Sequence, residues 1–231
     1  MEQYEASKFG EIFNTTLNGT RTTGMSRWLF KLLGGYLYVV ALIGILANGT
    51  SLFIFCKTSR LRAPINMLVV GLLFADLTRS IFGIPLAASS TYAGYWLWGF
   101  PLCIFQGIVV YFCGLSSMYI LMTISIHRYF LVIKQINITM VTYTPVGISL
   151  LCCFFFGLFW SIIPFSGWTR YDYESIRTSC TVAYDSTDDK VLSYNIAIFV
   201  FCFMLPVTTM VYCYYHILLK VSYRQVGNLK Q

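Results

Sequence analysis

Asp76 and Arg79 are charged residues inside an apolar stretch that runs from about residue 65 to 90. A carboxylate in the middle of a membrane helix is costly, so it must face the bundle interior or a water-filled cavity. Arg79 follows Asp76 by one helical turn, which makes a local ion pair possible. The pair either satisfies itself and holds helices together, or it belongs to an internal ion or water site. Asn48, in the preceding apolar stretch, is a second buried polar candidate.

Two of the eight cysteines are placed where a disulfide is plausible. Cys103 stands at the expected outer end of an apolar stretch, and Cys180 lies in a long polar loop on the same, oxidising side. The other cysteines are expected to be small apolar filler: Cys56, Cys113, Cys152, Cys153, Cys202 and Cys213. His127 and His216 stand far apart, so no metal site is predicted.

The sequence contains no pattern typical of a hydrolase or of a phosphoryl-transfer site. There is no Gly-rich phosphate loop and no Ser-His-Asp set, and paired carboxylates occur only in a solvated loop. The basic residues do not form a run interleaved with aromatics on a polar background, so no nucleic-acid partner is expected. Arg128, within His127-Arg128-Tyr129, is by itself an ordinary positive anchor at the inner end of a span.

The elements that carry these residues are membrane helices. Only 11% of the 231 residues are charged and 57% are hydrophobic, whereas a soluble domain has about 25% charged residues. A helix needs about 20 apolar residues to cross the hydrocarbon of a bilayer. The sequence therefore predicts an all-α membrane protein in the lipid bilayer, with five spans at about residues 31–56, 65–90, 101–133, 143–166 and 191–219.

The charges also predict the orientation of the spans. The segments after the first, third and fifth spans carry Lys and Arg but no Asp or Glu, whereas acidic residues gather in the N-terminal tail and between the fourth and fifth spans. Positive loops stay in the cytoplasm, so the N-terminus is expected outside and the C-terminus inside. The predicted organisation is a tail over 1–30, a bundle over 31–221 with an outer loop at 167–190, and a cytoplasmic tail over 222–231.

The N-terminal tail contains two glycosylation sequons, at Asn14 and Asn18. Both fit an extracellular tail, and both are candidate modification sites.

Several ordered motifs resemble the rhodopsin-like (class A) receptors, and within them the opsins. They are Gly44 to Asn48, Leu61-Arg62-Ala63-Pro64-Ile65-Asn66, Phe74-Ala75-Asp76-Leu77, Gly94 to Cys103, His127-Arg128-Tyr129, Trp160, and Pro206 with Tyr214. The loop from Gly167 to Cys180 is spaced like the opsin loop that covers the retinal pocket, and parts of the chain look like the peropsin, RGR-type and retinochrome group. The resemblance implies that the five spans are helices 1–5 of a seven-helix bundle.

The resemblance implies a retinal chromophore held as a protonated Schiff base, which needs a nearby carboxylate. Gln106 stands where visual pigments of vertebrates carry a glutamate, and Glu174 matches the loop counterion of other opsins, with Asp172 as a weaker candidate. The resemblance also implies a Cys103–Cys180 disulfide. Residues that match pocket positions are Gln106, Gly114, Tyr184, Phe199 and Phe203, and those that match the G-protein switch are His127, Arg128, Tyr129 and Tyr214.

Two departures keep several functions open. The attachment lysine of the family lies in the seventh helix, so the chain is expected to be a partial, C-terminally truncated sequence. His127 replaces the carboxylate that normally pairs with the adjacent arginine, which leaves G-protein coupling uncertain. The first hypothesis is a light-sensing receptor that couples to a G protein. The alternatives are a photoisomerase that converts all-trans to 11-cis retinal, in which case the protein would act as an enzyme, and a class A receptor for a diffusible ligand.

Overall fold

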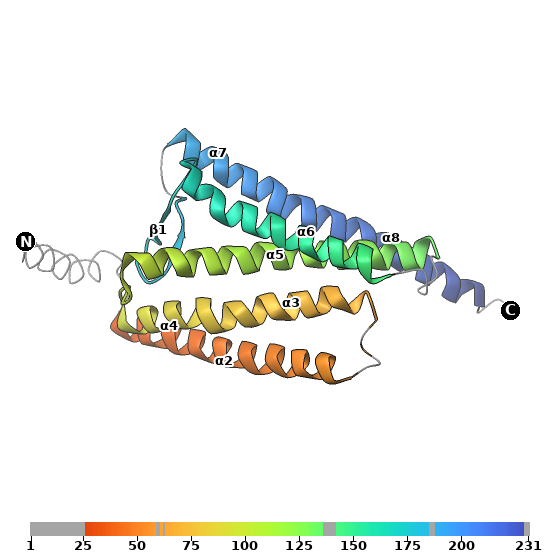
Figure 1. The fold of residues 1–231 in the computed structure, drawn as a ribbon, viewed down its shortest axis with the longest axis horizontal. Helices are drawn as coiled ribbons and strands as arrows, with labels where there is room; N and C mark the ends of the chain where they lie inside the picture. The colour runs from red at the N-terminus through yellow and green to blue at the C-terminus, as the bar shows by residue number, and fades with distance from the viewer. Residues whose placement is uncertain (1–25, 59–60, 62, 136–141, 185–187, 229–231) are drawn as a thin grey trace, which may run out of the picture.

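Five long apolar helices lie side by side and build the molecule (Figure 1). The structure is a computed structural model that describes residues 26–58, 61, 63–135, 142–184 and 188–228. Within these residues, five helices are long and apolar enough to cross a membrane, as the composition predicts. The sequons at Asn14 and Asn18 lie outside the described residues.

Two of the five spans are single α-helices, and the other three are each built from two or more consecutive helical segments. The first span is α2 (Arg27–Lys57), and the third is α5 (Gly99–Ile133). The fourth joins α6 (Tyr143–Ile162) to the 3₁₀ segment η4 (Ile163–Ser166). The second and fifth are interrupted by π-helical turns, in the orders α3 (Asn66–Thr78), η2 (Arg79–Gly83), α4 (Ile84–Ala93) and α7 (Asp189–Ile198), η5 (Phe199–Met204), α8 (Leu205–Asn228).

The helix ends differ from the expected spans by several residues. The first helix begins at Arg27, where Ser26 caps it through a hydrogen bond from the Leu29 amide to its hydroxyl. The last helix continues to Asn228, so most of the segment expected as a tail over 222–231 is helical. The apolar pattern ends near Leu219, but nothing between there and Asn228 stops a helix, because the segment contains no proline and its only glycine is Gly227.

The two π-helical turns each directly precede a proline-containing segment. Pro85 follows η2 and Pro206 follows η5. A proline has no backbone N–H, and its ring clashes with the carbonyl one turn earlier, so a widened turn relieves the clash within a continuous helix. The π-turns therefore have a sequence origin, and they displace the residues before them from ordinary helical register.

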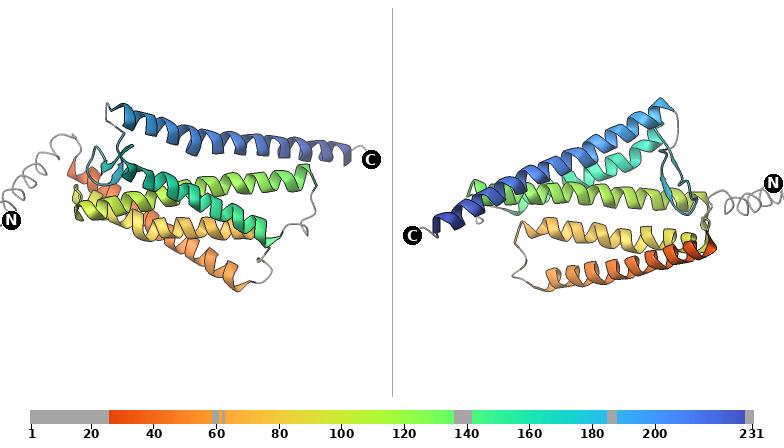
Figure 2. Two further views of the ribbon diagram at one scale, coloured as in Figure 1. Left: turned by 45° about the horizontal axis from the view of Figure 1, so that its top comes forward. Right: turned by 180° about the vertical axis from the view of Figure 1, so that it is seen from behind.

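The long helix α5 is the centre of the bundle. It packs against α3 on one side and against α6 and α8 on the other, while α2 packs against α3 and α4. Figure 2 shows the same order from two further directions, with α2 and α8 on opposite sides of the molecule. A core cluster that includes Ile120, Trp160 and Tyr194 lies where α5, α6 and α7 meet.

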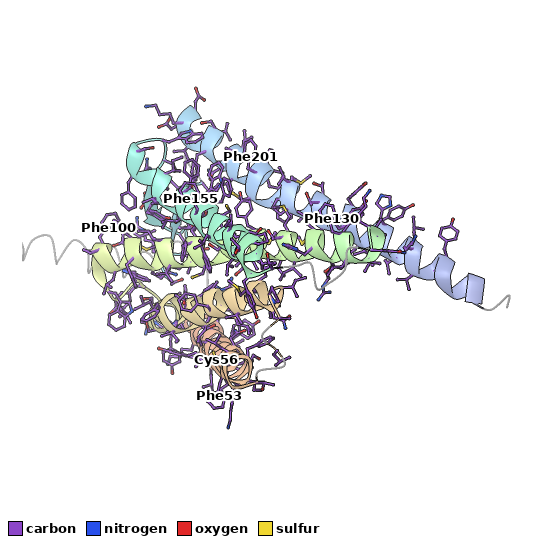
Figure 3. All side chains as sticks on the ribbon, turned by 45° about the vertical axis from the view of Figure 1, so that its right-hand side comes forward. Phe53, Cys56, Phe100, Phe130, Phe155 and Phe201 are labelled. Atoms are coloured by element: carbon purple, nitrogen blue, oxygen red, sulfur yellow. A yellow bond between two sulfur atoms is a disulfide. The ribbon has the colours of Figure 1, made fainter. Side chains whose placement is uncertain are left out.

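Apolar side chains also cover the outer faces of the helices. Large residues such as Phe53, Phe155 and Phe201 project from the bundle and are 64%, 64% and 52% exposed (Figure 3). In water this surface would aggregate, whereas in a bilayer it faces hydrocarbon or further apolar helices. The exposed surface therefore agrees with the membrane assignment from composition.

A short β-hairpin crosses the end of the bundle at which α2 begins (Figure 1). Its strands are β1 (Tyr171–Tyr173) and β2 (Cys180–Val182), paired antiparallel with Tyr173 opposite Cys180. The chain enters this loop through Gly167, whose φ of 85° ends the fourth span in a left-handed conformation. The hairpin lies against α5, and this position defines the candidate functional site.

Candidate functional site beneath the hairpin

The predicted disulfide is confirmed, and it holds the hairpin on the first turns of α5. Cys103 and Cys180 are bonded, and both are buried. One turn along α5, the buried Gln106 side chain accepts a hydrogen bond through its Oε1 from the Cys180 amide at 3.1 Å. Gln106, expected only as a pocket residue, thus also fixes the backbone of β2.

Tyr171 anchors the other strand. Its ring fills the space beside Gly107, where a Cβ on the glycine would stand only 2.8 Å from the ring. Its hydroxyl donates to the Ser161 carbonyl at the end of α6, at 2.8 Å. Burial raises the pKa of Tyr171, so the phenol keeps the proton that it donates. The hairpin is therefore wedged between α5 and α6.

Two contacts attach the ends of the loop to α7. The indole N–H of Trp168 donates to the Ser193 hydroxyl at 2.8 Å, and the Asn195 amide donates to the Ala183 carbonyl at 3.0 Å. Together with the disulfide to α5 and the Tyr171 contact with α6, these contacts position the loop from three helices.

The two candidate counterions have different surroundings. Asp172 pairs with Arg170 at 3.4 Å in an exposed ion pair. Glu174, at the start of the hairpin turn, accepts a hydrogen bond from the Ser179 hydroxyl and makes no ion pair among the described residues. Asp172 thus already has a cation beside it, whereas the charge of Glu174 is not neutralised by a salt bridge.

The residues expected to line a pocket are spread over three elements. Gly114 lies in the middle of α5, with no heavy atom within 4 Å of the position of an added Cβ. Phe199 and Phe203 stack on each other on η5 with centroids 5.6 Å apart, and both are about half exposed. Tyr184 is 52% exposed and shares a hydrogen bond with the Ser175 hydroxyl at 2.6 Å. The described residues do not enclose these side chains in one cavity.

A different apolar cavity, of about 240 Å³, lies under the turn of the hairpin. Ile176 and Thr178 of the turn close it against Phe30, Leu33 and other residues of α2 and against Thr91 of α4. None of the predicted pocket residues lines it. The hairpin turn therefore reaches across the bundle from α5 to α2, which the sequence alone does not show.

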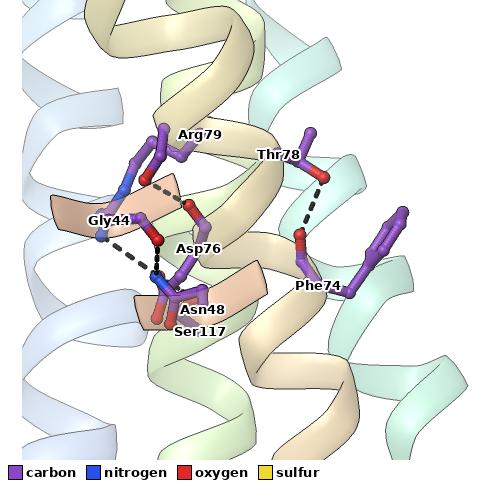
Figure 4. A network of polar contacts seen from close by, with 8 residues as sticks. Gly44, Asn48, Phe74, Asp76, Thr78, Arg79 and Ser117 are labelled. Atoms are coloured by element: carbon purple, nitrogen blue, oxygen red, sulfur yellow. Dashed lines mark hydrogen bonds and ion pairs between the residues drawn. The ribbon is translucent and has the colours of Figure 1, made fainter. Parts of the chain in front are cut away.

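Asp76 and Arg79 form the ion pair that their spacing permits. Arg79 Nη2 stands 3.1 Å from Asp76 Oδ1, and the Ser117 hydroxyl of α5 donates to the same oxygen at 3.4 Å (Figure 4). The Ser80 hydroxyl donates to the Asp76 carbonyl at 2.8 Å. Asn48 is close by in α2, but its amide donates to the Gly44 carbonyl of its own helix. The pair thus links the second span to α5.

At the opposite end of α5, an aromatic cluster surrounds the predicted switch. The Tyr129 ring lies 6.0 Å from that of Tyr212 and 6.1 Å from that of His216. Arg128 is exposed and forms no ion pair within the described part of the chain. Tyr214, expected in the same switch, is 38% exposed on α8.

Sequence reasoning missed two groups. Tyr212 and His216 were not predicted to lie at the switch, although their spacing of four residues places them on one helix face. Tyr119 was not singled out, yet its hydroxyl donates to the Phe201 carbonyl within η5 at 3.3 Å. The π-turn changes the normal hydrogen bonding of that carbonyl. In the sequence, Pro206 is the only residue that indicates such a turn.

Five apolar spans with a disulfide-pinned hairpin across one end define a helical bundle of the membrane-receptor type. Residues 47–230 match the family described as 7 transmembrane receptor (rhodopsin family), and the chain belongs to this family. The expected likeness to opsins is confirmed by the individual relatives.

Human visual pigment-like receptor peropsin is 30% identical over 200 residues, which cover 86% of this chain and 59% of peropsin. The mouse peropsin is 32% identical over 217 residues, which cover 92% of this chain and 62% of that protein. A crystal structure of squid rhodopsin matches with a TM-score of 0.80 and 25% identity, over 89% of this chain and 60% of the rhodopsin. The chain thus spans about three fifths of the length of these proteins.

Proposed function

We propose that the chain forms the retinal-binding side of a light-sensing opsin, with the outer hairpin as the lid of the chromophore pocket. The observation that carries the proposal is the hairpin itself, fixed over α5 by the Cys103–Cys180 bond, Gln106 and Tyr171. Fixed lids of this kind exclude water from an apolar ligand. The relatives named as visual pigment-like receptor and rhodopsin support the same assignment.

The residues that match pocket positions suit an apolar polyene. The open space at Gly114 and the stacked Phe199 and Phe203 offer a smooth apolar surface of the kind that binds such ligands. Bound retinal would supply the light-driven isomerisation. None of the seven lysines of the sequence lies in the middle of a span, so the binding proposed for this chain is non-covalent.

Filling the space at Gly114 tests the pocket. We expect Gly114→Leu to weaken saturable binding of all-trans-retinal to the 231-residue chain by about ten-fold or more, because the side chain takes the volume of the ligand. Quenching of tryptophan fluorescence in lipid nanodiscs measures the affinity. Gly35→Leu is the matched control, since Gly35 on α2 has equally open space. Equal affinities of the two variants, or no saturable binding, would contradict the pocket.

The role of Glu174 can be tested without a covalent chromophore. A protonated retinylamine carries a positive charge at the end of the same polyene, whereas retinol is neutral. If Glu174 is the counterion, Glu174→Gln should lower the affinity for retinylamine by about ten-fold and leave retinol binding unchanged. Asp172→Asn is the control, because Asp172 is already paired with Arg170. A larger loss with Asp172→Asn would move the assignment to that residue.

A photoisomerase is the second candidate, and the surroundings of Arg128 favour it. In this chain the neutral His127 stands beside Arg128, and Arg128 has no carboxylate partner in the described residues. The carboxylate that pairs with this arginine in the resembled family is thus absent, and a switch built on that ion pair is missing its anion. Retinal extracted before and after illumination separates the two candidates, since net formation of 11-cis retinal from all-trans marks the isomerase.

We further propose the orientation indicated by the charges, with the hairpin end outside the cell and the end carrying Arg128 in the cytoplasm. On this orientation, a heterotrimeric G protein would bind at the end of α5 that carries Tyr129.

A further inference from the structure

We propose that Arg79 is the built-in counter-cation of Asp76, so that the polar core of this bundle is neutral by itself and binds no inorganic cation. The proposal concerns the middle of the second span and does not rest on retinal binding.

Asp76 is the only acidic residue in the middle of any of the five spans. A lone carboxylate at this depth must be neutralised by a proton, a metal ion or a basic side chain. Arg79 is the only basic residue in the middle of a span, and its guanidinium stands 3.1 Å from the carboxylate. The two charges cancel within one helical turn.

Asp76 Oδ1 is occupied by two hydrogen-bond donors, and one of them is a guanidinium, which has no lone pair for a cation. Arg79 Nη2 and the Ser117 hydroxyl both donate to this oxygen (Figure 4). Hard cations need several oxygen lone pairs around them, and N–H groups cannot provide these. A metal ion beside Asp76 would also stand close to the positive guanidinium, which repels it.

The backbone helps to hold the guanidinium in this place. Arg79 is the first residue of the π-turn η2, and its carbonyl accepts from the Ile84 amide. The neighbouring Ser80 hydroxyl is bonded to the Asp76 carbonyl, which ties the start of the π-turn to the residue that carries the charge. Arg79 Nε is buried and has no acceptor among the described residues, so the contact of Nη2 with Asp76 is the ion pair that holds the guanidinium.

The Asp76 carboxylate becomes a cation site once the guanidinium is removed. The Asp76 and Arg79 side chains are 26% and 39% exposed, so the helices around them do not seal off the carboxylate oxygens. Arg79→Gln keeps a polar side chain, shorter and neutral, and leaves the negative charge uncompensated. The variant is therefore expected to gain the sodium dependence that the wild-type chain lacks.

The experiment measures the thermal unfolding midpoint of the full 231-residue chain in nanodiscs of neutral lipid. Sodium chloride is exchanged for choline chloride at constant ionic strength. We expect the midpoint of the wild type to be unchanged. That of Arg79→Gln should rise with sodium in a saturable way, by about 4 °C at ten-fold excess over the dissociation constant.

Two further variants complete the test. Arg79→Lys keeps the positive charge and should stay independent of sodium, and Asp76→Asn combined with Arg79→Gln should lose the gained dependence. If Arg79→Gln does not fold, Arg79→Met replaces it as a neutral side chain of similar bulk.

Two outcomes would overturn the proposal. One is saturable stabilisation of the wild type by sodium that Asp76→Asn abolishes. The other is a folded neutral variant at position 79 whose midpoint does not respond to sodium.

Discussion

Replacing Cys180 by serine is expected to lower the free energy of unfolding by about 4 kcal/mol. The Cys103–Cys180 bond closes a loop with a sequence separation of 77 residues, and opening so long a loop releases much conformational entropy in the unfolded chain. The bond also places the Cys180 amide against Gln106 Oε1, so the reduced chain loses a buried hydrogen bond as well. The hairpin would detach from α5, and the proposed retinal lid would be lost with it.

Unfolding by a denaturing detergent, monitored by tryptophan fluorescence, measures this effect. Cys103→Ser should match Cys180→Ser, and the double variant should be no worse than either, because all three remove the same bond. Cys152→Ser is the control, since Cys152 is exposed and outside the disulfide. A loss below about 1 kcal/mol would mean that the hairpin is held by its packing alone.

The second large effect is expected at Gly34. Alanine at this position would place a Cβ 2.6 Å from the backbone N and Cα of Tyr92, where α2 meets α4. Backbone atoms cannot rotate away as a side chain can, so the two helices must separate. We expect a loss of about 2–3 kcal/mol from this overpacking.

The neighbouring Gly35 provides the matched comparison. A Cβ at Gly35 meets nothing within 4 Å, so Gly35→Ala should be neutral or stabilising by up to about 1 kcal/mol through helix propensity. The same unfolding assay applies to both variants. Equal stabilities of the two would show that α2 does not approach α4 as closely as the structure indicates.

The spans could be predicted from sequence because their signal is local, whereas the disulfide was predicted from the placement of two cysteines and from the family resemblance. An uninterrupted apolar run predicts a membrane helix whatever it packs against, and Cys103 and Cys180 lie in the expected outer segments. The ends of the helices were harder, since α8 continues past the apolar run to Asn228. The π-turn before Pro85 was not predicted, although a proline inside a span is its visible cause.

The candidate site, too, was predicted only in part from the sequence. Glu174 and Asp172 were ranked by motif spacing, but only the structure shows that Arg170 pairs with Asp172 and not with Glu174. The open space at Gly114 could not be foreseen either, because the volume beside a glycine depends on which helix lies opposite.

By itself, the sequence determined that this protein lies in a lipid bilayer. It also determined the number of spans, the family resemblance and the spacing that lets Asp76 pair with Arg79. These properties follow from composition and from contacts within one or two helical turns. Only the tertiary structure decided that Ser117 joins the ion pair, that Tyr171 fills the space beside Gly107, and that the hairpin turn reaches α2. The reason is physical: these contacts join segments far apart in the chain, and their geometry depends on how whole helices pack.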